Sequence, residues 1–466
     1  MKKKKFTASD IKADATIGVF GHYGRWNLGD ESIIAGVIQN IAKRLPKARI
    51  VCFSRNPLDT SNRYNVEAYP VRRDSNASRP IEQPLGARDD TTCPEGNEKQ
   101  DTRNHGGLRS FLNGVKAFVK RSRFGAMLVS TAGKVVRSVP TFFEELRFLK
   151  KSYRILGDID LLMITGSNQF LDNFGGPWGY PYTLLKWSTM ARLSGTHLIY
   201  VSVGAGPVES KLSMLMFRWA VKHSEYTSLR DGPSEDLIRA MGVRQETSVY
   251  PDLAYSVYTS QDLSKDARLQ SRGAKPTVGI NPMPVYDRRY WYLADDQRYA
   301  RYVKNLAKFA AILLSEDYPL VFWGTHPQDQ NVISDVLTRV ESELKRKSDS
   351  MHMTATANTV DELIALIRSF DLVVPTRFHG TLLSLSAGKP VLSICYHRKS
   401  ADLMMEMGQS EYSVSLDTMD FENLLIRFKN LEHNMREEID KIRSKSDEYR
   451  KDLTKQYDRL FGPPSF

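Results

Sequence analysis

Short apolar runs of strand length alternate with amphipathic helical stretches along most of this 466-residue chain. The first unit is TIGVFG (residues 16–21), then a glycine-rich turn, then a helix. The apolar residues of that helix recur at helical spacing: Ile33, Ile34, Val37, Ile38, Ile41 and Leu45. ARIVCFSR, IDLLMITG and THLIYVSVG repeat the strand signal further on. This alternation predicts an α/β fold with parallel sheets covered by helices on both faces.

A second strand series begins after the polar segment SQDLSKDARLQSRGAK and includes PTVGINP, YPLVFWGTH and DLVVPTRFHG. We therefore place a domain boundary near residue 270, with one Rossmann-like domain over residues 1–270 and another over 271–420. Residues 421–466 form a charged helical tail, whose apolar side contains Leu424, Leu425, Phe428 and Leu431.

Two adjoining segments depart from this pattern. Residues 74–107 are polar, contain several Pro and Gly, and have no periodic apolar stripe, which predicts a mobile insertion. Residues 109–154 contain eleven Lys and Arg against two Glu, so they supply +9 of the net charge of +12. Two interpretations of the helical part of this stretch remain open. It is a basic helix that lies on an anionic membrane surface, or a helix packed on the protein with a solvated basic face.

Cysteine usage indicates a reducing compartment, and the hydropathy pattern indicates neither a membrane span nor a signal peptide. Cys52, Cys93 and Cys395 are far apart and odd in number, which argues against a disulfide framework or a thiolate metal site. No stretch of about 18 apolar residues is present, and the basic start MKKKKF is followed by polar sequence rather than by the core of a signal peptide. We expect a cytoplasmic protein, with the inner face of the membrane as a peripheral location.

The stretch DLVVPTRFHG is the first candidate site. We expect a strand over residues 371–375, a turn over 376–380, and a helix from Thr381 whose N-terminal N–H groups attract an anion. Arg377 offers a planar fork that suits a carboxylate or phosphate, and His379 can bind an anion and also donate a proton. The alternative is a surface arginine beside a histidine that is hydrogen-bonded to a backbone carbonyl.

Arg230 and Asp231 end the strand-like run YTSLR, before a helix that we expect Ser234 to cap. They form either a second anion site or a local surface pair. In the loop GHYGRWNLGD, Asn27, Asp30 and Glu31 can hydrogen-bond sugar hydroxyls, while the other interpretation makes Asp30 the N-cap and Glu31 a first-turn residue of the next helix. The loop matches neither the dinucleotide-binding glycine pattern nor the P-loop.

Two further loops follow predicted strands and can add polar groups to the same cleft between the two sheets. TGSNQFLD contributes Gly166, Asn168 and Gln169, and GTHPQD contributes His326. No His, Cys or Asp spacing typical of a metal site is present, nor is a nucleophile motif. We therefore predict no metal and no cofactor.

An ordered set of motifs resembles the polysaccharide pyruvyl transferase family. The set is GHYGRWNLGDE (residues 21–31), TGSNQFLD, VSVGAGP, TSLRD, PDLA and TRFHG followed by GKPVLSICYHRK (residues 376–399). The resemblance covers about residues 16–410 apart from the insertion. It implies two Rossmann-like domains in a GT-B-like arrangement with a cleft between them.

The resemblance also implies phosphoenolpyruvate as co-substrate and a sugar hydroxyl pair as acceptor, with a pyruvate ketal as product. The family's donor-binding cations correspond to Arg230, Arg377 and His379, and Gly380 and Lys399 belong to the same motif. His379 is the candidate acid for the methylene carbon, with Arg377 and Arg230 opposite the developing charge. Asp30 or Glu31 is the candidate to handle the hydroxyl proton.

Two other functions fit parts of the same sequence. Two Rossmann-like domains with a basic cleft also suit a glycosyltransferase that uses a nucleotide sugar. A membrane-surface or nucleic-acid binding module would use residues 109–154 as its contact. No stacking aromatics alternate with these basic residues, so we expect no nucleic-acid partner.

Overall fold

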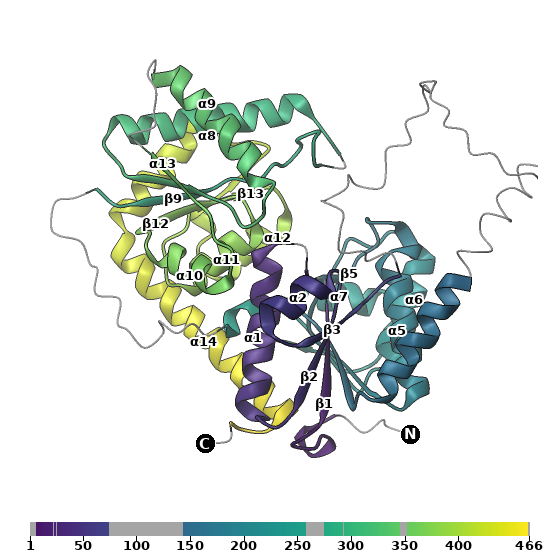
Figure 1. The fold of residues 1–466 in the computed structure, drawn as a ribbon. Coiled ribbons are helices and arrows are strands. Elements are labelled where there is room, and N and C mark those ends of the chain that lie inside the picture. Colours follow the sequence, from purple (N-terminus) through teal and green to yellow (C-terminus); the bar gives the residue numbers. More distant parts are fainter. Residues whose placement is uncertain are drawn as a thin grey trace, which may run out of the picture. The chain divides into compact units, whose positions relative to one another are not determined.

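The structure is a computed structural model, shown in Figure 1, that describes residues 6–21, 23–24, 26–73, 143–257, 275–291, 293–344 and 352–464. Four features of the sequence analysis lie outside the described residues. They are the insertion at 74–107, the first part of the basic segment at 109–142, the domain boundary near 270, and Cys93. Residues 86–155 form a separate unit, of which residues 143–155 are described and are helical.

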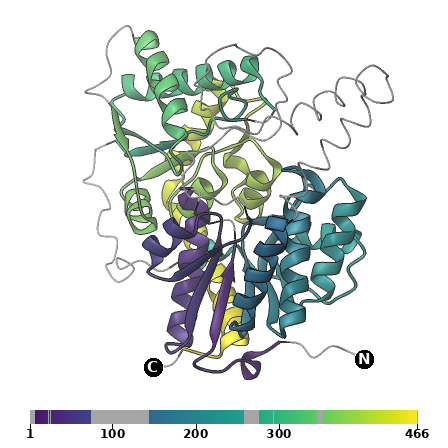
Figure 2. The same cartoon turned by 45° about the vertical axis from the view of Figure 1, so that its right-hand side comes forward.

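The first sheet is parallel and follows the order β3-β2-β1-β4-β6-β7-β8. Its strands are β1 (Thr16–Phe20), β2 (Arg49–Ser54), β3 (Glu67–Pro70), β4 (Leu161–Thr165), β6 (His197–Ala205), β7 (Tyr226–Leu229) and β8 (Ser248–Val249), and β5 (Asn168–Phe170) pairs with β6. The helices between them are α1 (Leu28–Arg44), α2 (Pro57–Tyr64), α5 (Tyr180–Ser194), α6 (Lys211–Lys222) and α7 (Gly232–Ala240). Figures 1 and 2 show α1 on one face of this sheet and α5 with α6 on the other.

The second sheet is also parallel, in the order β11-β10-β9-β12. Its strands are β9 (Val278–Asn281), β10 (Leu320–Trp323), β11 (His352–Ala355) and β12 (Leu372–Pro375), and a separate pair joins β13 (Ser393–Cys395) to β14 (Ser413–Ser415). Its helices are α8 (Asp296–Ser315), α9 (Asp329–Leu344), α10 (Val360–Arg368), α11 (Phe378–Ser386), α12 (Arg398–Glu406) and α13 (Phe421–His433). Short 3₁₀ turns are η1 (Ala8–Asp10), η2 (Gly176–Trp178), η3 (Leu253–Ser256) and η4 (Ser410–Tyr412). The expected α/β class with two parallel sheets is confirmed.

Continuous apolar runs form the central strands because both faces of each sheet are covered. Every residue of β4, β9 and β12 is buried, as a parallel sheet with helices on both sides requires. Trp187 and Trp323 are among the largest fully buried side chains and pack with Phe53 and Phe370 respectively. The indole N–H of Trp187 donates to the Val71 carbonyl at 3.0 Å, so this buried ring leaves no unmet donor.

The C-terminal helix α14 (Met435–Phe461) contacts both halves of the molecule (Figure 1). Ile442, Leu453, Tyr457 and Leu460 recur on one buried face of an otherwise charged helix. Near its middle, the Ser446 hydroxyl donates to the Leu385 carbonyl of α11 at 2.9 Å. Near its end, Arg44 of α1 forms an ion pair with Asp458 at 2.7 Å. The tail therefore ties the second sheet's helices to the first sheet's α1.

Three expected helix starts or caps were wrong, and in two of them a side chain earlier in the chain caps the helix. Helix α1 begins at Leu28, since Asn27 accepts from the Gly29 N–H, and Asp30 lies in the first turn rather than at the N-cap. Helix α7 is capped by Asp231, which accepts from Ser234 N. Helix α11 begins at Phe378 rather than Thr381. His379 therefore stands in the first helical turn instead of a preceding loop.

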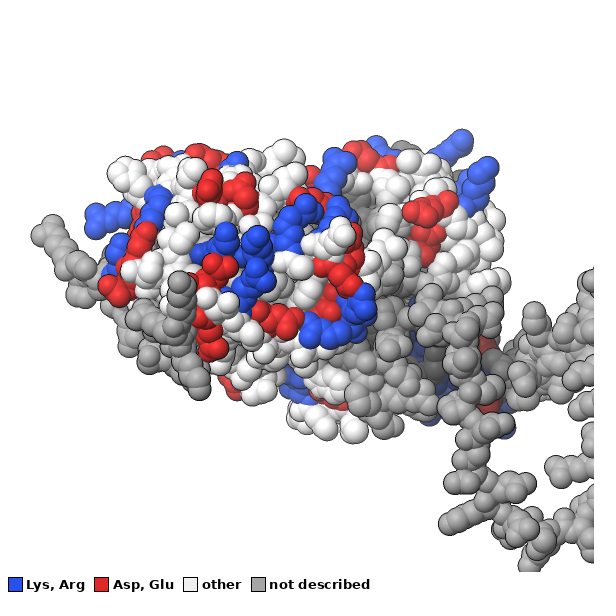
Figure 3. All heavy atoms as spheres, turned by 90° about the horizontal axis from the view of Figure 1, so that it is seen from above, with Lys and Arg blue, Asp and Glu red and all other residues white. Residues whose placement is uncertain are grey.

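Acidic and basic side chains of the described residues lie interspersed on the face seen in Figure 3. Lys429 pairs with Glu316 and Arg298 pairs with Asp417, which are two examples of surface ion pairs in the second domain.

Among the described residues, none of the helices has the length and apolar composition that a membrane span requires.

Candidate active site

The loops at the carboxyl ends of both sheets carry the polar residues singled out in the sequence. The Leu28 N–H, at the start of α1, donates to the Thr325 carbonyl after β10 at 2.9 Å, so the two carboxyl edges adjoin each other. In open α/β sheets, ligands bind at this edge. The candidate residues after β1, β4 and β7 of the first sheet thus come close to those after β10 and β12 of the second.

Arg230, immediately after β7, is buried and paired. Its side chain is 5% exposed and forms ion pairs with Asp252 at 3.0 Å and with Asp231 at 3.4 Å. Its guanidinium carbon lies 4.9 Å from the ring centroid of Phe378, a cation–π distance. A buried guanidinium needs such partners to offset its lost hydration. The pair interpretation of Arg230 and Asp231 is therefore correct in part, but the pair is inside the protein, and Asp252 is the closer partner.

A cavity of about 340 Å³ lies beside Arg230, and we call it the Arg230 cavity. Its walls come from the end of β6, from the residues after β7, and from α7, η3, α11, α12 and α14. Its ionisable lining residues are Arg230, His397, Arg398, Lys399, Asp231, Asp252, Asp402, Glu406, Tyr255 and Tyr449. The described lining therefore combines three Lys and Arg with four carboxylates and a histidine.

Lys399 is the cation of this cavity whose charge depends most on its surroundings. Burial, and next the nearby Arg230 guanidinium, lower the pKa of Lys399 to about 7. Its Nζ donates to the Gly206 carbonyl at 3.3 Å. An anion bound in the cavity would favour the protonated form, so Lys399 can gain charge when a ligand binds.

His397 was not among the residues chosen from the sequence, although it lies within the motif GKPVLSICYHRK. It caps α12, with Nδ1 accepting from the Lys399 N–H at 3.2 Å. Nε2 therefore carries the proton of the neutral ring. Burial, followed by Lys399, lowers the pKa of His397. The neutral ring thus offers an N–H donor to the cavity at the N-terminus of α12.

Arg377 is held by a buried carboxylate. Its Nε donates to Asp329 Oδ1 and Oδ2 at 2.8 and 2.7 Å, and a further contact joins Nη2 to Oδ1. Asp329, fully buried at the start of α9, also accepts from the Thr325 and His326 N–H groups at 3.0 and 3.1 Å. Much of the guanidinium fork of Arg377 therefore faces Asp329, which fixes it at the N-terminus of α11.

His379 packs directly on the first turn of α1. A Cβ added at Gly29 would lie 2.6 Å from His379 Cγ, so only glycine permits this approach. His379 Nε2 is buried and has no hydrogen-bond partner among the described residues. Burial raises the pKa of Asp30, and the nearby His379 opposes that rise more than any other charged group. A histidine and a carboxyl group of raised pKa therefore face each other across the junction of the two sheets.

Glu31 is directed into the first domain instead. It is fully buried and accepts from the Gly24 N–H and from the Tyr64 hydroxyl, both at 2.8 Å. Burial raises the pKa of its carboxyl to about 7. These contacts brace the glycine-rich loop after β1. Asn27, by contrast, donates to Asp30 Oδ2 at 2.7 Å, so it positions the carboxyl group that lies near His379.

The short strand β5, which follows β4 after a tight turn, supplies two amides rather than the loop residues expected from the sequence. The Asn168 Nδ2 donates to the Gly206 carbonyl at 2.6 Å, and the Gln169 Nε2 donates to the Thr165 carbonyl at 2.7 Å. The carbonyl oxygens of both side chains are buried and have no partner among the described residues. Gly166 makes the turn between these strands, with φ of +37°.

The remaining two candidates line the second sheet's edge. The His326 Nδ1 accepts from the Gln328 N–H at 3.2 Å. A Cβ at Gly380 would overlap the amide oxygen of Asn281, so the first turn of α11 approaches β9 closely. Asn281, which sequence reasoning missed, is fully buried, and its Oδ1 also has no partner among the described residues.

The buried polar atoms without a described partner at these carboxyl edges include His379 Nε2, Asn168 Oδ1, Gln169 Oε1, Asn281 Oδ1 and Thr325 Oγ1. Each such atom costs about 1–3 kcal/mol when it is left unmet. Native proteins retain them where a ligand or an ordered water completes the bonding. The combination of these acceptors, the His379 ring and the Arg230 cavity describes a polar small-molecule site.

A family model described as polysaccharide pyruvyl transferase matches residues 27–398, well over half of the chain. Among solved structures, a putative UDP-N-acetylglucosamine 2-epimerase from Listeria monocytogenes is 10% identical, with a TM-score of 0.52 over 97% of this chain and 99% of that one. The UDP-GlcNAc 2-epimerase from Neisseria meningitidis, solved with UDP-GlcNAc, is 11% identical, with a TM-score of 0.50 over 94% and 99%. HepE from Anabaena, solved with UDP, is 12% identical, with a TM-score of 0.50 over 94% and 95%. These likenesses establish the fold, two Rossmann-like domains in a GT-B-like arrangement.

Proposed function

We propose, from the premise that this chain belongs to the polysaccharide pyruvyl transferase family, that it transfers pyruvate from phosphoenolpyruvate to a sugar hydroxyl pair. The product is a pyruvate ketal on a polysaccharide or on its lipid- or nucleotide-linked precursor. The observation that carries the proposal is the His379 ring, whose buried Nε2 has no partner among the described residues and which faces Asp30 beside a cavity that contains Arg230 and Lys399.

The donor needs compensation for a carboxylate and a phosphate. Arg230, Lys399 and the neutral His397 N–H converge on the Arg230 cavity, and the N-terminus of α12 adds its dipole. Three of the cavity's four carboxylates are already paired, because Asp252 and Asp231 pair with Arg230 and Asp402 pairs with Arg398. Lys399 gains its proton as the donor binds, which adds the charge that the free cavity lacks.

The chemistry requires an acid for carbon and a base for oxygen. As one sugar hydroxyl attacks C2 of phosphoenolpyruvate, His379 gives a proton to C3, which becomes the methyl group, and Asp30 takes the hydroxyl proton. The C2–O bond to phosphate then breaks, and inorganic phosphate leaves. The second hydroxyl adds to C2 and gives its proton to His379, which is by then unprotonated, and the ketal closes. Arg377, held by Asp329, and Arg230 stabilise the charge that develops on the departing phosphate.

The sugar acceptor binds the side-chain amides of Asn168 and Gln169, whose carbonyl oxygens have no partner among the described residues. In this proposal Asn168 Oδ1 and Gln169 Oε1 accept hydrogen bonds from sugar hydroxyls, with Gly166 and His326 on the surrounding loops. Asn27 orients Asp30, and Glu31 holds the loop that carries both. A lipid-linked acceptor would place the protein at the cytoplasmic face of the membrane, with the basic residues 109–154 in contact with anionic lipid.

A nucleotide-sugar glycosyltransferase is the second candidate, because HepE and the Neisseria meningitidis epimerase, which share the fold, were solved with UDP or UDP-GlcNAc. The two functions differ in the donor. A thermal-shift titration of phosphoenolpyruvate and, separately, of a panel of UDP-sugars distinguishes them, because a ligand that binds only the folded state raises Tm.

The titration is repeated with Arg230→Lys, and with Arg239→Ala as the matched control. Arg239 lies on the exposed side of α7 and pairs with Glu235. We expect phosphoenolpyruvate to raise the Tm of the wild type and of Arg239→Ala, and to raise that of Arg230→Lys less at the same concentration. A rise with UDP-sugars alone would reject the pyruvyl transferase proposal in favour of the glycosyltransferase.

A further inference from the structure

Trp26 is a bulky residue in a backbone conformation that favours glycine. Its φ is +54°, in the left-handed region, where an L side chain crowds its own backbone. The residue is also 39% exposed, so burial in the core does not fully offset the cost of this conformation. Its indole makes no hydrogen bond or ring contact with another described residue. Non-glycine residues in this region persist where the surrounding structure fixes them, and such positions cluster at ligand sites.

Backbone hydrogen bonds on both sides of Trp26 hold it in place. Before it, the Gly24 N–H donates to Glu31 Oε1 at 2.8 Å. After it, the Leu28 N–H donates to the Thr325 carbonyl at 2.9 Å. The stretch that carries Trp26 is therefore attached to α1 at one end and to the second sheet at the other.

The position of Trp26 in the fold is at the candidate active site. It lies between the carboxyl end of β1 and the start of α1, at the edge where ligands of open α/β sheets bind. Its neighbour Asn27 donates to Asp30 Oδ2 at 2.7 Å, and Asp30 faces His379. The exposed tryptophan is therefore next to the residue that orients the proposed base.

An indole face complements a sugar ring. One face of a pyranose consists mainly of C–H groups, and a flat aromatic side chain can cover that face while polar groups bind the hydroxyls. Tryptophan provides a large, rigid area for this contact and has only two side-chain torsions to restrict on binding. Asn168 and Gln169 supply acceptors for hydroxyls but no such apolar surface.

We propose that Trp26 is a specificity-determining residue, whose indole stacks on the apolar face of the acceptor's sugar ring. It favours pyranoses in which the C–H groups of one face are not interrupted by an axial hydroxyl. This inference rests on the proposed function, which makes a sugar the acceptor.

Saturation-transfer NMR on the full chain tests the stacking without the donor. The probes are methyl β-glucopyranoside, methyl β-galactopyranoside and methyl α-mannopyranoside. We expect saturation to be strongest at the C–H protons of one ring face. Affinity should fall about 10-fold in Trp26→Ala, the loss expected for one aromatic contact, and recover in part in Trp26→Phe. Trp219→Ala is the matched control, because Trp219 is a partly exposed tryptophan near the end of α6, at the opposite edge of the sheet.

Trp26→Gly separates stacking from loop structure. Glycine adopts a φ of +54° without strain, so Tm should be retained or should rise, while sugar affinity falls as in Trp26→Ala. With phosphoenolpyruvate present, Trp26→Ala should raise the KM for the acceptor and leave the Tm shift caused by phosphoenolpyruvate unchanged.

Three results would overturn the proposal. One is that the wild type binds none of the methyl hexosides, and another is that Trp219→Ala loses as much affinity as Trp26→Ala. The third is unchanged sugar affinity in Trp26→Ala, and a loss of binding to phosphatidylglycerol vesicles in that variant would then assign the indole to a lipid surface. The proposed function fails separately. Hexoside binding that depends on Trp26, without turnover of phosphoenolpyruvate, would reject pyruvyl transfer and retain the stacking.

Discussion

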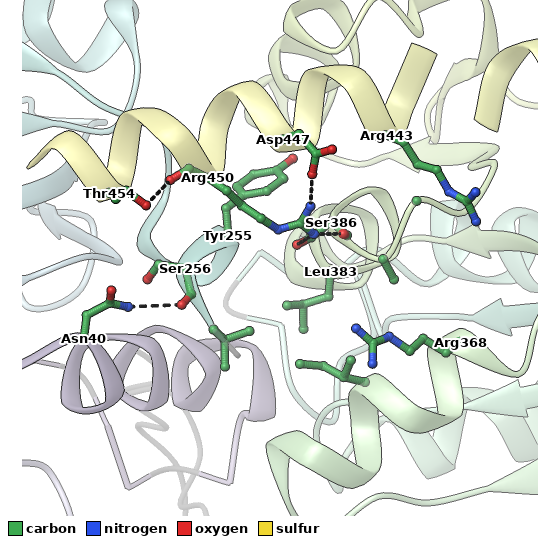
Figure 4. A pocket seen from close by; sticks show the side chains of 14 residues that line it. Asn40, Tyr255, Ser256, Arg368, Leu383, Ser386, Arg443, Asp447, Arg450 and Thr454 are labelled. Atoms are coloured by element: carbon green, nitrogen blue, oxygen red, sulfur yellow. Dashed lines mark hydrogen bonds and ion pairs between the residues drawn. The ribbon is translucent and has the colours of Figure 1, made fainter. Parts of the chain in front are cut away.

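The Arg230 cavity and a second cavity of about 410 Å³ beside α14, which we call the α14 cavity (Figure 4), share the side chain of Tyr255 but differ in the charge of their linings. In the Arg230 cavity, three Lys and Arg face four carboxylates, and the central guanidinium is buried between two of them. The lining of the α14 cavity also contains three cations, Arg368, Arg443 and Arg450, but one carboxylate, that of Asp447, which pairs with Arg450 at 2.8 Å. A count of cations is therefore a poor guide to the candidate active site. Carboxylates there position the cations and tune their pKa values.

The largest expected effect is on the rate of the catalysed reaction. His379→Ala should lower kcat by about 10²–10⁴-fold, the usual contribution of a general acid. Phosphoenolpyruvate binding should persist, because Arg230 and Lys399, the cations proposed to hold the donor, are unchanged. Steady-state rates and calorimetry on the same preparation check this. Turnover close to that of the wild type would remove His379 from the mechanism.

Arg230→Lys should weaken phosphoenolpyruvate binding by about 10–100-fold, because a lysine cannot reproduce the planar, multiply bonded guanidinium. Lysine retains a positive charge beside Asp252 and so limits the loss of stability that an unpaired buried carboxylate would cause. Equilibrium binding, with Tm measured in parallel, checks the effect. Unchanged donor affinity would move the donor site elsewhere.

Lys399 should give donor binding a pH dependence. With its pKa lowered to about 7, Lys399 is protonated below that pH and neutral above it, so an anion binds more strongly at low pH. We expect affinity for phosphoenolpyruvate to fall about 10-fold between pH 7 and pH 8.5. Lys399→Met serves as the control, because it retains only the titration of the donor and of other groups. Identical pH profiles for the two proteins would show that Lys399 does not take up the proton.

The smallest effect concerns the wall between the cavities. Tyr255→Phe removes a hydroxyl that contacts Met407 Sδ at 3.6 Å and keeps the ring that packs against Tyr449. Unfolding free energy should change by less than about 1 kcal/mol, and phosphoenolpyruvate affinity by less than about twofold. Chemical denaturation and calorimetry measure these. A larger loss of affinity would show that the tyrosine hydroxyl shapes the Arg230 cavity.

Short-range patterns in the sequence were sufficient to predict the parallel strands and the loops that lie together at their carboxyl ends. Period and composition along the chain predicted parallel strands such as β1, β4 and β12, because a strand buried on both faces must be apolar at every position. Polar residues directly after these strands predicted which loops meet, because the carboxyl ends of parallel strands share one edge. The motifs singled out Arg230, Arg377, His379 and Lys399 as candidate donor-binding residues.

The partners of those residues depend on contacts that no local pattern contains. Asp329 lies 48 positions from Arg377, and Asp252 lies 22 positions from Arg230. Helix starts were misplaced because several nearby residues can accept from the first N–H groups, and packing selects among them. The sequence by itself determined the fold class, the family and the candidate cations. Only the tertiary structure decided which cations are neutralised by buried carboxylates, that Glu31 braces a loop, and that α14 completes a second, arginine-rich cavity. The physical reason is that burial and pairing, which set charge and pKa, are properties of distant segments brought together.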